Sequence, residues 1–395
     1  NVAAFIEGAH SDPGSFVLLS AKHFPGHGDT AEDSHMQLAK LDQPKERIES
    51  VELVPFRAAI AHGVDSVMTA HLAVPAFEPE EKPATVSRNV LTNLLRDELA
   101  FKGLIVTDAL EMQGIASLYS QGEAAIRSLE AGADVLLMPT DPDACIRAIT
   151  AAVNSGRLSA GRINASVSKV LAAKQKTGLF RSRLVNLDHI SDDLETQKLG
   201  QLAQNVADRS FTLVKDEKHL FPMPAGEGSC LVVLSEGEFS TRGQALVQAL
   251  KPGSSPFNVY VAHPSMPETL LAGFASDIAH CKQVYVAAFI TVAANRGRVA
   301  LEGNLNSFLK ALIAGPAPVA LISLGNPYLL RDFPQVSAYA ATFSTAVTSE
   351  IATAKAMLGE IAISGKLPVS IPPVAKIGEG MNVPAEAKPA SNGSK

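Results

Sequence analysis

The sequence predicts an α/β protein in which the C-terminal half of a (β/α)8 TIM barrel is followed by a second α/β sandwich domain. Its 395 residues exceed what one hydrophobic core usually holds, so two domains are expected. Short apolar runs alternate with amphipathic segments in both halves of the chain, which is typical of β/α units around a parallel sheet. A polar stretch between the halves, within residues 181–209, is predicted to be a linker with a connecting helix.

Four buried strands are predicted in the first domain, residues 1–180, because each run is almost continuously apolar, as a strand covered on both faces is. They are residues 16–22, 64–70, 104–108 and 134–138. Among the helices between them, 44–62 begins at a proline and ends before Gly63, while 87–103 repeats apolar residues at helical spacing. A barrel needs eight strands to close, so its N-terminal strands are expected to be missing from this chain.

The second domain, residues 210–375, repeats the alternation of strands and helices. Its predicted strands are residues 230–235, 258–262, 283–290, 319–325 and 339–343. Residues 376–395 are rich in Pro, Ala, Gly, Ser and Lys. A segment of that composition buries too little apolar surface to fold, so we expect a disordered tail there.

Composition excludes several classes of function. The formal net charge is -6 without a long basic block, which argues against binding to nucleic acid or to an anionic membrane surface. No apolar run approaches the roughly 18 residues that a membrane span needs. Cys145, Cys230 and Cys281 lie far apart in no metal-binding or redox spacing, so we expect three separate buried cysteines. The chain opens on Asn1 rather than Met, which leaves a cytoplasmic or exported location open.

The densest polar cluster follows the first predicted strand. Residues 22–30 read KHFPGHGDT, and Asp33-Ser34-His35 come directly after them. The carboxyl ends of parallel barrel strands form the catalytic face, so this run is expected to lie in an active site. Its glycines permit sharp turns, while Lys22 and His23 at the strand end can donate hydrogen bonds to a ligand's hydroxyl groups.

Two further polar residues end apolar strands on the same face. Asp108 ends the third strand, where a carboxylate must be hydrogen-bonded or functional; the alternative is the N-cap of a helix that starts at Leu110. His71 ends the second strand, and the competing interpretation there is a core histidine with satisfied hydrogen bonds.

The run 22–28 with Asp33-Ser34-His35 resembles the signature of bacterial family 3 β-N-acetylglucosaminidases of the NagZ type, in their two-domain form. Further segments extend the resemblance in the order that this family uses: DSVMTAH (65–71), PATVS (83–87), GLIVTDALEMQGI (103–115), AGADVLLMP (131–139) and SGRLSAGRINAS (155–166). The resemblance is close over residues 1–180. It is looser in the second half, through 209–222 and SGKLPVSIP (364–372).

The resemblance implies a retaining glycosidase in which Asp108 is the nucleophile and forms a covalent glycosyl-enzyme. It also implies that the acid/base is His35, held by Asp33 on a mobile loop, where most retaining enzymes use a second carboxylic acid. Histidine can donate a proton to a leaving oxygen and later take one from water near neutral pH. A neighbouring carboxylate fixes the imidazole tautomer and favours the imidazolium.

The family also implies a sugar subsite, lined here by Lys22, His23, His71 and Met112, and no cofactor or metal. The implied substrate is a glycoside with a terminal non-reducing β-linked N-acetylglucosamine, such as a peptidoglycan fragment (muropeptide). The chain has no Trp and five Tyr, so stacking platforms for a long polysaccharide are not expected. A pocket for one terminal sugar fits better.

Alternatives remain at this point. A family 3 β-glucosidase would take its acid from a glutamate of the second domain, such as Glu302, although the Asp33-Ser34-His35 triplet favours the glucosaminidase. Phosphorolysis is open too, because a histidine repels an anionic acceptor less than a glutamate does. The chain could also bind a sugar without turnover. A metal-dependent hydrolase would need metal ligands converging from the set His23, His27, Asp33, His35 and His71.

Overall fold

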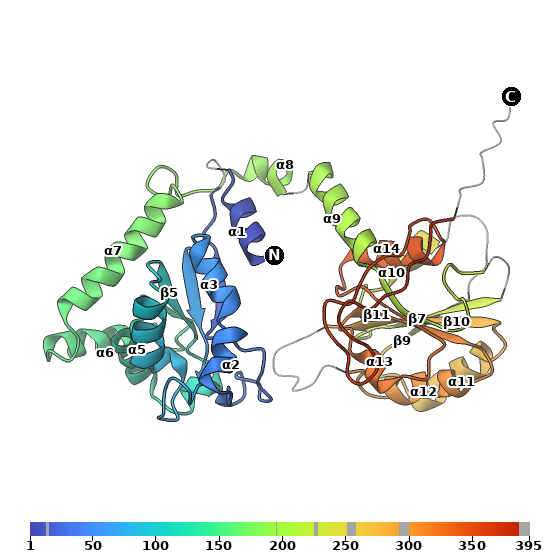
Figure 1. Cartoon of the computed structure of the whole chain (residues 1–395), viewed down its shortest axis with the longest axis horizontal. Coiled ribbons are helices and arrows are strands. Elements are labelled where there is room, and N and C mark those ends of the chain that lie inside the picture. The colour runs from blue at the N-terminus through green and yellow to red at the C-terminus, as the bar shows by residue number, and fades with distance from the viewer. Residues whose placement is uncertain (13–15, 195, 225–227, 251–257, 292–299, 387–395) are drawn as a thin grey trace. The chain divides into compact units, whose positions relative to one another are not determined.

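Each half of the chain is built on its own sheet. The computed structural model describes the chain except for residues 13–15, 195, 225–227, 251–257, 292–299 and 387–395 (Figure 1). The described residues divide into two units, 1–185 and 186–395. Within these residues, the helices are all too short or too polar to cross a membrane.

The first unit contains a four-stranded parallel sheet in the order β1-β3-β5-β6. Its strands are β1 (Ser20–Phe24), β3 (Ser66–Thr69), β5 (Leu104–Ala109) and β6 (Val135–Leu137). Strands that follow one another in the chain are neighbours in the sheet, with helices between them, which confirms the predicted half of a (β/α)8 TIM barrel. The first strand starts later than the predicted 16–22 because its pairing with β3 begins only at Ser20.

Helices and short strands connect these four strands. The helices are α1 (Val2–Ala9), α2 (Lys45–Ser50), α3 (Val54–Ala61), η2 (Ala84–Val86), the π-helix η3 (Asn89–Glu98), α4 (Gln113–Ala116), α5 (Gln121–Ala131), α6 (Pro142–Asn154) and α7 (Ala160–Lys176), and the short strands are β2 (Ala39–Lys40) and β4 (Leu72–Ala73). The predicted helix 44–62 is in fact two helices. Val51 leaves helical geometry, and the second helix restarts with Pro55 in its first turn, where a missing N–H costs nothing.

The second unit has a six-stranded sheet in the order β7-β12-β11-β10-β8-β9, parallel except for the edge strand β7. The strands are β7 (Thr212–Asp216), β8 (Ser229–Leu234), β9 (Asn258–Ala262), β10 (Gln283–Ile290), β11 (Val319–Gly325) and β12 (Ala338–Ala341), and the helices are η4 (Leu187–His189), α8 (Ile190–Leu194), α9 (Gln197–Ser210), α10 (Gln244–Leu250), α11 (Glu268–Ile278), α12 (Leu305–Ala314), α13 (Leu329–Asp332) and α14 (Val347–Met357). Alternate residues of the central strands enter two separate hydrophobic clusters, so both faces of the sheet are covered.

Two parts of the second unit differ from expectation. We did not predict β7, a short strand that ends in charged residues at the sheet edge. Residues 376–386 are not a disordered tail, because their backbone pairs with the unit: the N–H of Met381 donates to Leu213 at 2.7 Å and that of Glu386 to Gly359 at 2.8 Å. The rest of the predicted tail, 387–395, lies outside the described residues. Within the predicted linker, α9 packs on α14 through a Lys355 to Asp208 contact of 2.8 Å.

The cysteine expectation was wrong for two of the three residues. Cys230, at the start of β8, is joined to Cys281 by a disulfide with a Cα–Cα distance of 5.9 Å. The two residues are 51 positions apart but meet because Cys281 lies in the turn that leads into β10, the sheet neighbour of β8. Cys145 is buried and free.

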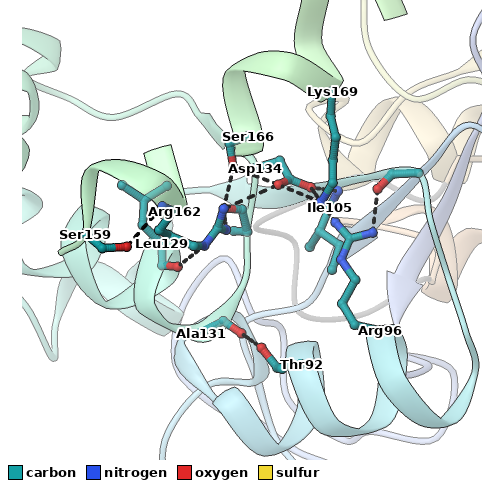
Figure 2. A network of polar contacts seen from close by, with 12 residues as sticks. Thr92, Arg96, Ile105, Leu129, Ala131, Asp134, Ser159, Arg162, Ser166 and Lys169 are labelled. Atoms are coloured by element: carbon teal, nitrogen blue, oxygen red, sulfur yellow. Dashed lines mark hydrogen bonds and ion pairs between the residues drawn. The ribbon is translucent and has the colours of Figure 1, made fainter. Parts of the chain in front are cut away.

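A buried carboxylate organises the amino edge of the first sheet (Figure 2). Asp134 directly precedes β6, and its side chain is fully buried. Its oxygens accept hydrogen bonds from Ser166 at 2.7 Å and from the backbone N–H of Ile105 at 3.1 Å. Cationic groups complete the shell: Arg96, Lys169 at 3.1 Å and Arg162 at 3.6 Å. Burial alone would raise the pKa of this carboxyl, but these partners bring it below the ordinary value.

We therefore expect Asp134→Ala to lower the free energy of unfolding of the first unit by about 3–5 kcal/mol, because it leaves buried cations unpaired. The loss is measured by denaturant unfolding at neutral pH, with Asp97→Ala, an exposed aspartate of η3, as the control. Since the folded pKa of Asp134 is depressed, its stabilisation is present above the ordinary value of 3.8 and is lost as pH falls through the folded pKa. A variant as stable as the control would contradict this account.

Candidate active site

The predicted catalytic and binding residues of the first unit gather at the carboxyl edge of its sheet, opposite Asp134. Lys22 and His23 lie in β1, His71 lies two residues after the end of β3, and Asp108 lies near the end of β5. Parallel pairing of β1 with β3 and of β3 with β5 sets these strand ends side by side. Residues that are distant in the sequence thus share one face.

Asp108 is held at the strand end with part of its side chain accessible. One oxygen accepts a hydrogen bond from the N–H of Ala109 at 2.9 Å, and the other lies 3.7 Å from Nε2 of His23. The side chain is 14% exposed, so a ligand can reach it. Burial lowers the pKa of His23. The negative charge of Asp108 raises this pKa, and the positive charge of Lys22 lowers it further. His23 is therefore neutral at pH 7 and acts as a hydrogen-bonding group.

His71 faces the protein with both ring nitrogens. Its Nε2 is 2.9 Å from the carbonyl oxygen of Ala109, which can only accept, so Nε2 carries the proton. Its Nδ1 is 2.9 Å from the hydroxyl of Thr85. The residue has no exposed surface. This geometry favours the core-histidine interpretation over a direct sugar contact: His71 fixes the peptide that follows the nucleophile candidate.

Asp33 and His35 form a close pair on a loop. Nδ1 of His35 lies 2.7 Å from an oxygen of Asp33, and the same oxygen accepts the backbone N–H of His35 at 2.9 Å. Nδ1 is therefore committed to the carboxylate, which leaves Nε2 at the far side of the ring for proton exchange. The His35 side chain is 44% exposed.

The loop that carries this pair rests on the segment that follows Asp108. Backbone N–H groups at the start of α4 donate to the loop, from Gln113 to the carbonyl of His35 at 3.4 Å and from Gly114 to that of Ser34 at 3.3 Å. Burial lowers the pKa of both His23 and His71. The charge of Asp108 raises these two pKa values, and the charge of His35 lowers them. The structure therefore brings the carboxylate and the acid/base candidate to one site.

The remaining candidates occupy different positions. Lys22 is exposed, and Met112, the N-cap residue of α4, is 7% exposed. Glu302, the alternative acid, belongs to the second unit and precedes α12. Within the described part of the chain, no three His, Cys, Asp or Glu residues are arranged to hold a metal ion. His27, named above as a possible ligand, instead contacts Ser34 and Thr30.

Sequence reasoning missed the residues that support the candidates. Thr85 bonds His71, and Ser34 bonds His27, yet neither was assigned a role. Both lie inside the family-like segments, in PATVS and in Asp33-Ser34-His35. Their presence in those segments was the only available signal, because hydroxyl partners of buried histidines follow no spacing rule.

A parallel β/α unit with a carboxylate and an Asp–His pair at its carboxyl edge is an arrangement typical of barrel enzymes. Residues 2–173 match the family profile described as the glycosyl hydrolase family 3 N-terminal domain. A family 3 β-N-acetylglucosaminidase structure from Paenibacillus sp. str. FPU-7 is 35% identical, with a TM-score of 0.81 over 91% of this chain and 68% of that one. This chain belongs to glycoside hydrolase family 3.

Two longer relatives match most of the chain. A β-N-acetylglucosaminidase/β-glucosidase of Cellulomonas fimi is 26% identical over 380 residues, and β-hexosaminidase A of Pseudoalteromonas piscicida is 29% identical over 407. The matches cover 89% and 90% of this chain. The chain spans 66% of the length of each relative.

We expect the imidazole of His71 to titrate below its ordinary value of 6.5, because burial disfavours the charged ring more than the Ala109 carbonyl and Asp108 favour it. Nitrogen and ring-proton NMR shifts across pH 5–8, assigned with a His71→Gln variant, measure this. Since the folded state favours the neutral ring, His71 lowers stability as pH falls below 6.5, where only the unfolded chain gains the proton. A titration midpoint at or above 6.5 would contradict the buried, neutral assignment.

Proposed function

We propose that this chain carries the catalytic residues of a retaining β-N-acetylglucosaminidase that removes a terminal non-reducing β-linked N-acetylglucosamine. The observation that carries the proposal is the Asp33–His35 pair, with its 2.7 Å contact, on a loop that rests on the segment following Asp108. A carboxylate and a histidine at one barrel edge provide the nucleophile and the acid/base that double displacement needs. The names of the Paenibacillus and Pseudoalteromonas relatives support the same activity.

The proposed reaction uses these residues in two steps. Asp108 attacks the anomeric carbon while Nε2 of His35 gives its proton to the leaving oxygen, so the glycosidic bond breaks and a glycosyl ester forms. His35 then takes a proton from water, which attacks the same carbon and frees Asp108. Asp33 keeps Nδ1 of the ring engaged through both steps, so Nε2 alone exchanges protons.

The substrate proposal is a single sugar bound at the end of a glycoside. Lys22 and His23 in β1 would donate hydrogen bonds to its hydroxyl groups, and Met112 would form part of the apolar wall. We propose a peptidoglycan fragment as the natural substrate, with the aglycone reaching out of the pocket. The proposal involves no cofactor, because the two carboxylates and the histidine account for each proton and bond.

We expect the intact protein to turn over nitrophenyl β-N-acetylglucosaminide in preference to nitrophenyl β-glucoside, measured as kcat/KM at pH 7. The comparison matters because the Cellulomonas relative carries both activities in its name. The same assay with and without phosphate, scored for sugar 1-phosphate, tests phosphorolysis. A higher kcat/KM on the glucoside, or obligatory sugar phosphate formation, would replace the proposal with one of these alternatives.

We expect Asp108→Ala to reduce hydrolysis to less than about one-thousandth, since no covalent intermediate can form. His35→Ala should cost about 10²–10⁴-fold on glycosides with poor leaving groups, and far less on dinitrophenyl glycosides, whose leaving oxygen needs no proton. Steady-state kinetics on both substrate types measures the difference. Equal losses on the two types would remove His35 from the acid role.

A further inference from the structure

Ser34, between Asp33 and His35, is held from its side chain by a histidine outside the pair. The residue is 4% exposed, and its hydroxyl lies 2.8 Å from Nε2 of His27. The other ring nitrogen of His27 lies 3.0 Å from the hydroxyl of Thr30. Both ring nitrogens of His27 are thus engaged within the loop, so His27 has no need of a ligand to satisfy it.

The backbone of Ser34 is held by a different element, α4. Its carbonyl accepts the N–H of Gly114 at 3.3 Å. A Cβ at position 114 would lie 2.9 Å from that carbonyl oxygen and 3.1 Å from Cβ of His71, so only glycine lets the loop come this close without a shift. The loop is therefore held at the α4 segment, by the N–H groups of Gln113 and Gly114, and at His27, by the hydroxyl of Ser34.

His27 follows a tightly packed turn at Gly26, directly after β1. Gly26 has φ +134°, and a Cβ there would lie 2.7 Å from Cβ of Glu52. Glu52 is buried and receives two hydrogen bonds from Arg47, each of 2.7 Å. The close approach of Gly26 and this ion pair fix the turn from which the imidazole reaches Ser34.

We infer that His27 is a positioning residue, which holds Asp33 and His35 over Asp108 through the hydroxyl of Ser34. The inference rests on the proposed function and adds a residue to it. Two anchors, the backbone N–H groups at the start of α4 and the His27 ring, define the position of the loop between them. Loss of the His27 anchor leaves the loop attached only at α4, so His35 spends less time where it can protonate the leaving oxygen.

Side-chain geometry supplies matched variants for the test. In His27→Gln the amide nitrogen takes the place of Nε2 and can reach Ser34. In His27→Asn it takes the place of Nδ1 and reaches only Thr30. Ser34→Ala removes the other partner of the same bond. His62→Ala, a histidine at the end of α3 that pairs with Glu7, serves as the control.

The experiment measures kcat/KM of the intact protein on aryl N-acetylglucosaminides that span poor to good leaving groups, with thermal melting to confirm folding. We expect His27→Ala and Ser34→Ala to lose about tenfold on poor leaving groups and about twofold or less on dinitrophenyl glycoside. The double variant should lose no more than either single variant, because both remove one interaction. Gln should recover most of the loss, and Asn little.

Uniform losses across the leaving-group series, additive losses in the double variant, or equal recovery by Gln and Asn would overturn the inference. A second readout separates its failure from that of the proposed function. We expect amide hydrogen exchange at residues 33–37 to rise in His27→Ala and not in His62→Ala. This measurement needs no substrate, so it does not depend on the proposed activity. Turnover by the parent protein with unchanged exchange in His27→Ala sinks the inference alone. If the parent protein shows no turnover but exchange rises in His27→Ala, the proposed glucosaminidase activity is wrong and the anchoring of the loop by His27 still holds.

Discussion

The site depends on parallel pairing of β1, β3 and β5. The register Ser20 to Ser66 and Ser66 to Leu104 aligns three strands so that they end at one edge. The residues after those ends, far apart in the sequence, then meet without any direct bond having to bring them together. The short helix α4 begins at the same edge, and its first N–H groups donate hydrogen bonds to the loop that carries Asp33 and His35.

The carboxylates at the two edges of the first sheet differ in how fully they are paired. At the amino edge, Asp134 has its charge satisfied by cations and hydrogen bonds, and Asp65 is paired with Lys176 at 2.6 Å and His10 at 2.9 Å. Partners hold the pKa of both carboxyls low despite burial, so they stay ionised and fixed. At the carboxyl edge, Asp108 has one backbone donor and a histidine at 3.7 Å, which leaves it room to react.

The sequence predicted what continuous apolar runs and local spacing encode. Strands 283–290 and 319–325 have the predicted bounds because buried parallel strands are almost continuously apolar. Strand 258–262 has its predicted bounds as well, although it lies at the edge of the sheet and is largely exposed. Strand β7 has only two apolar residues, Leu213 and Val214, before it ends in Lys215 and Asp216, so it gave no such signal. Contacts between residues that are distant in the sequence could not be predicted either, because no local pattern encodes them. Neither the Cys230–Cys281 disulfide nor the Thr85 partner of His71 follows from spacing, since tertiary pairing alone creates them.

Burial explains why one residue type can fill three roles around a single carboxylate. His71 has no exposed surface, and burial lowers its pKa, so it serves as a neutral ring that fixes the peptide after Asp108. His23 is partly exposed and also neutral, suited to hydrogen bonds with a sugar. His35 is 44% exposed, and its Nδ1 lies 2.7 Å from an oxygen of Asp33, so the ring is held from one nitrogen while its surface stays accessible. Burial and the neighbouring polar groups, rather than residue type, therefore distinguish the three imidazoles.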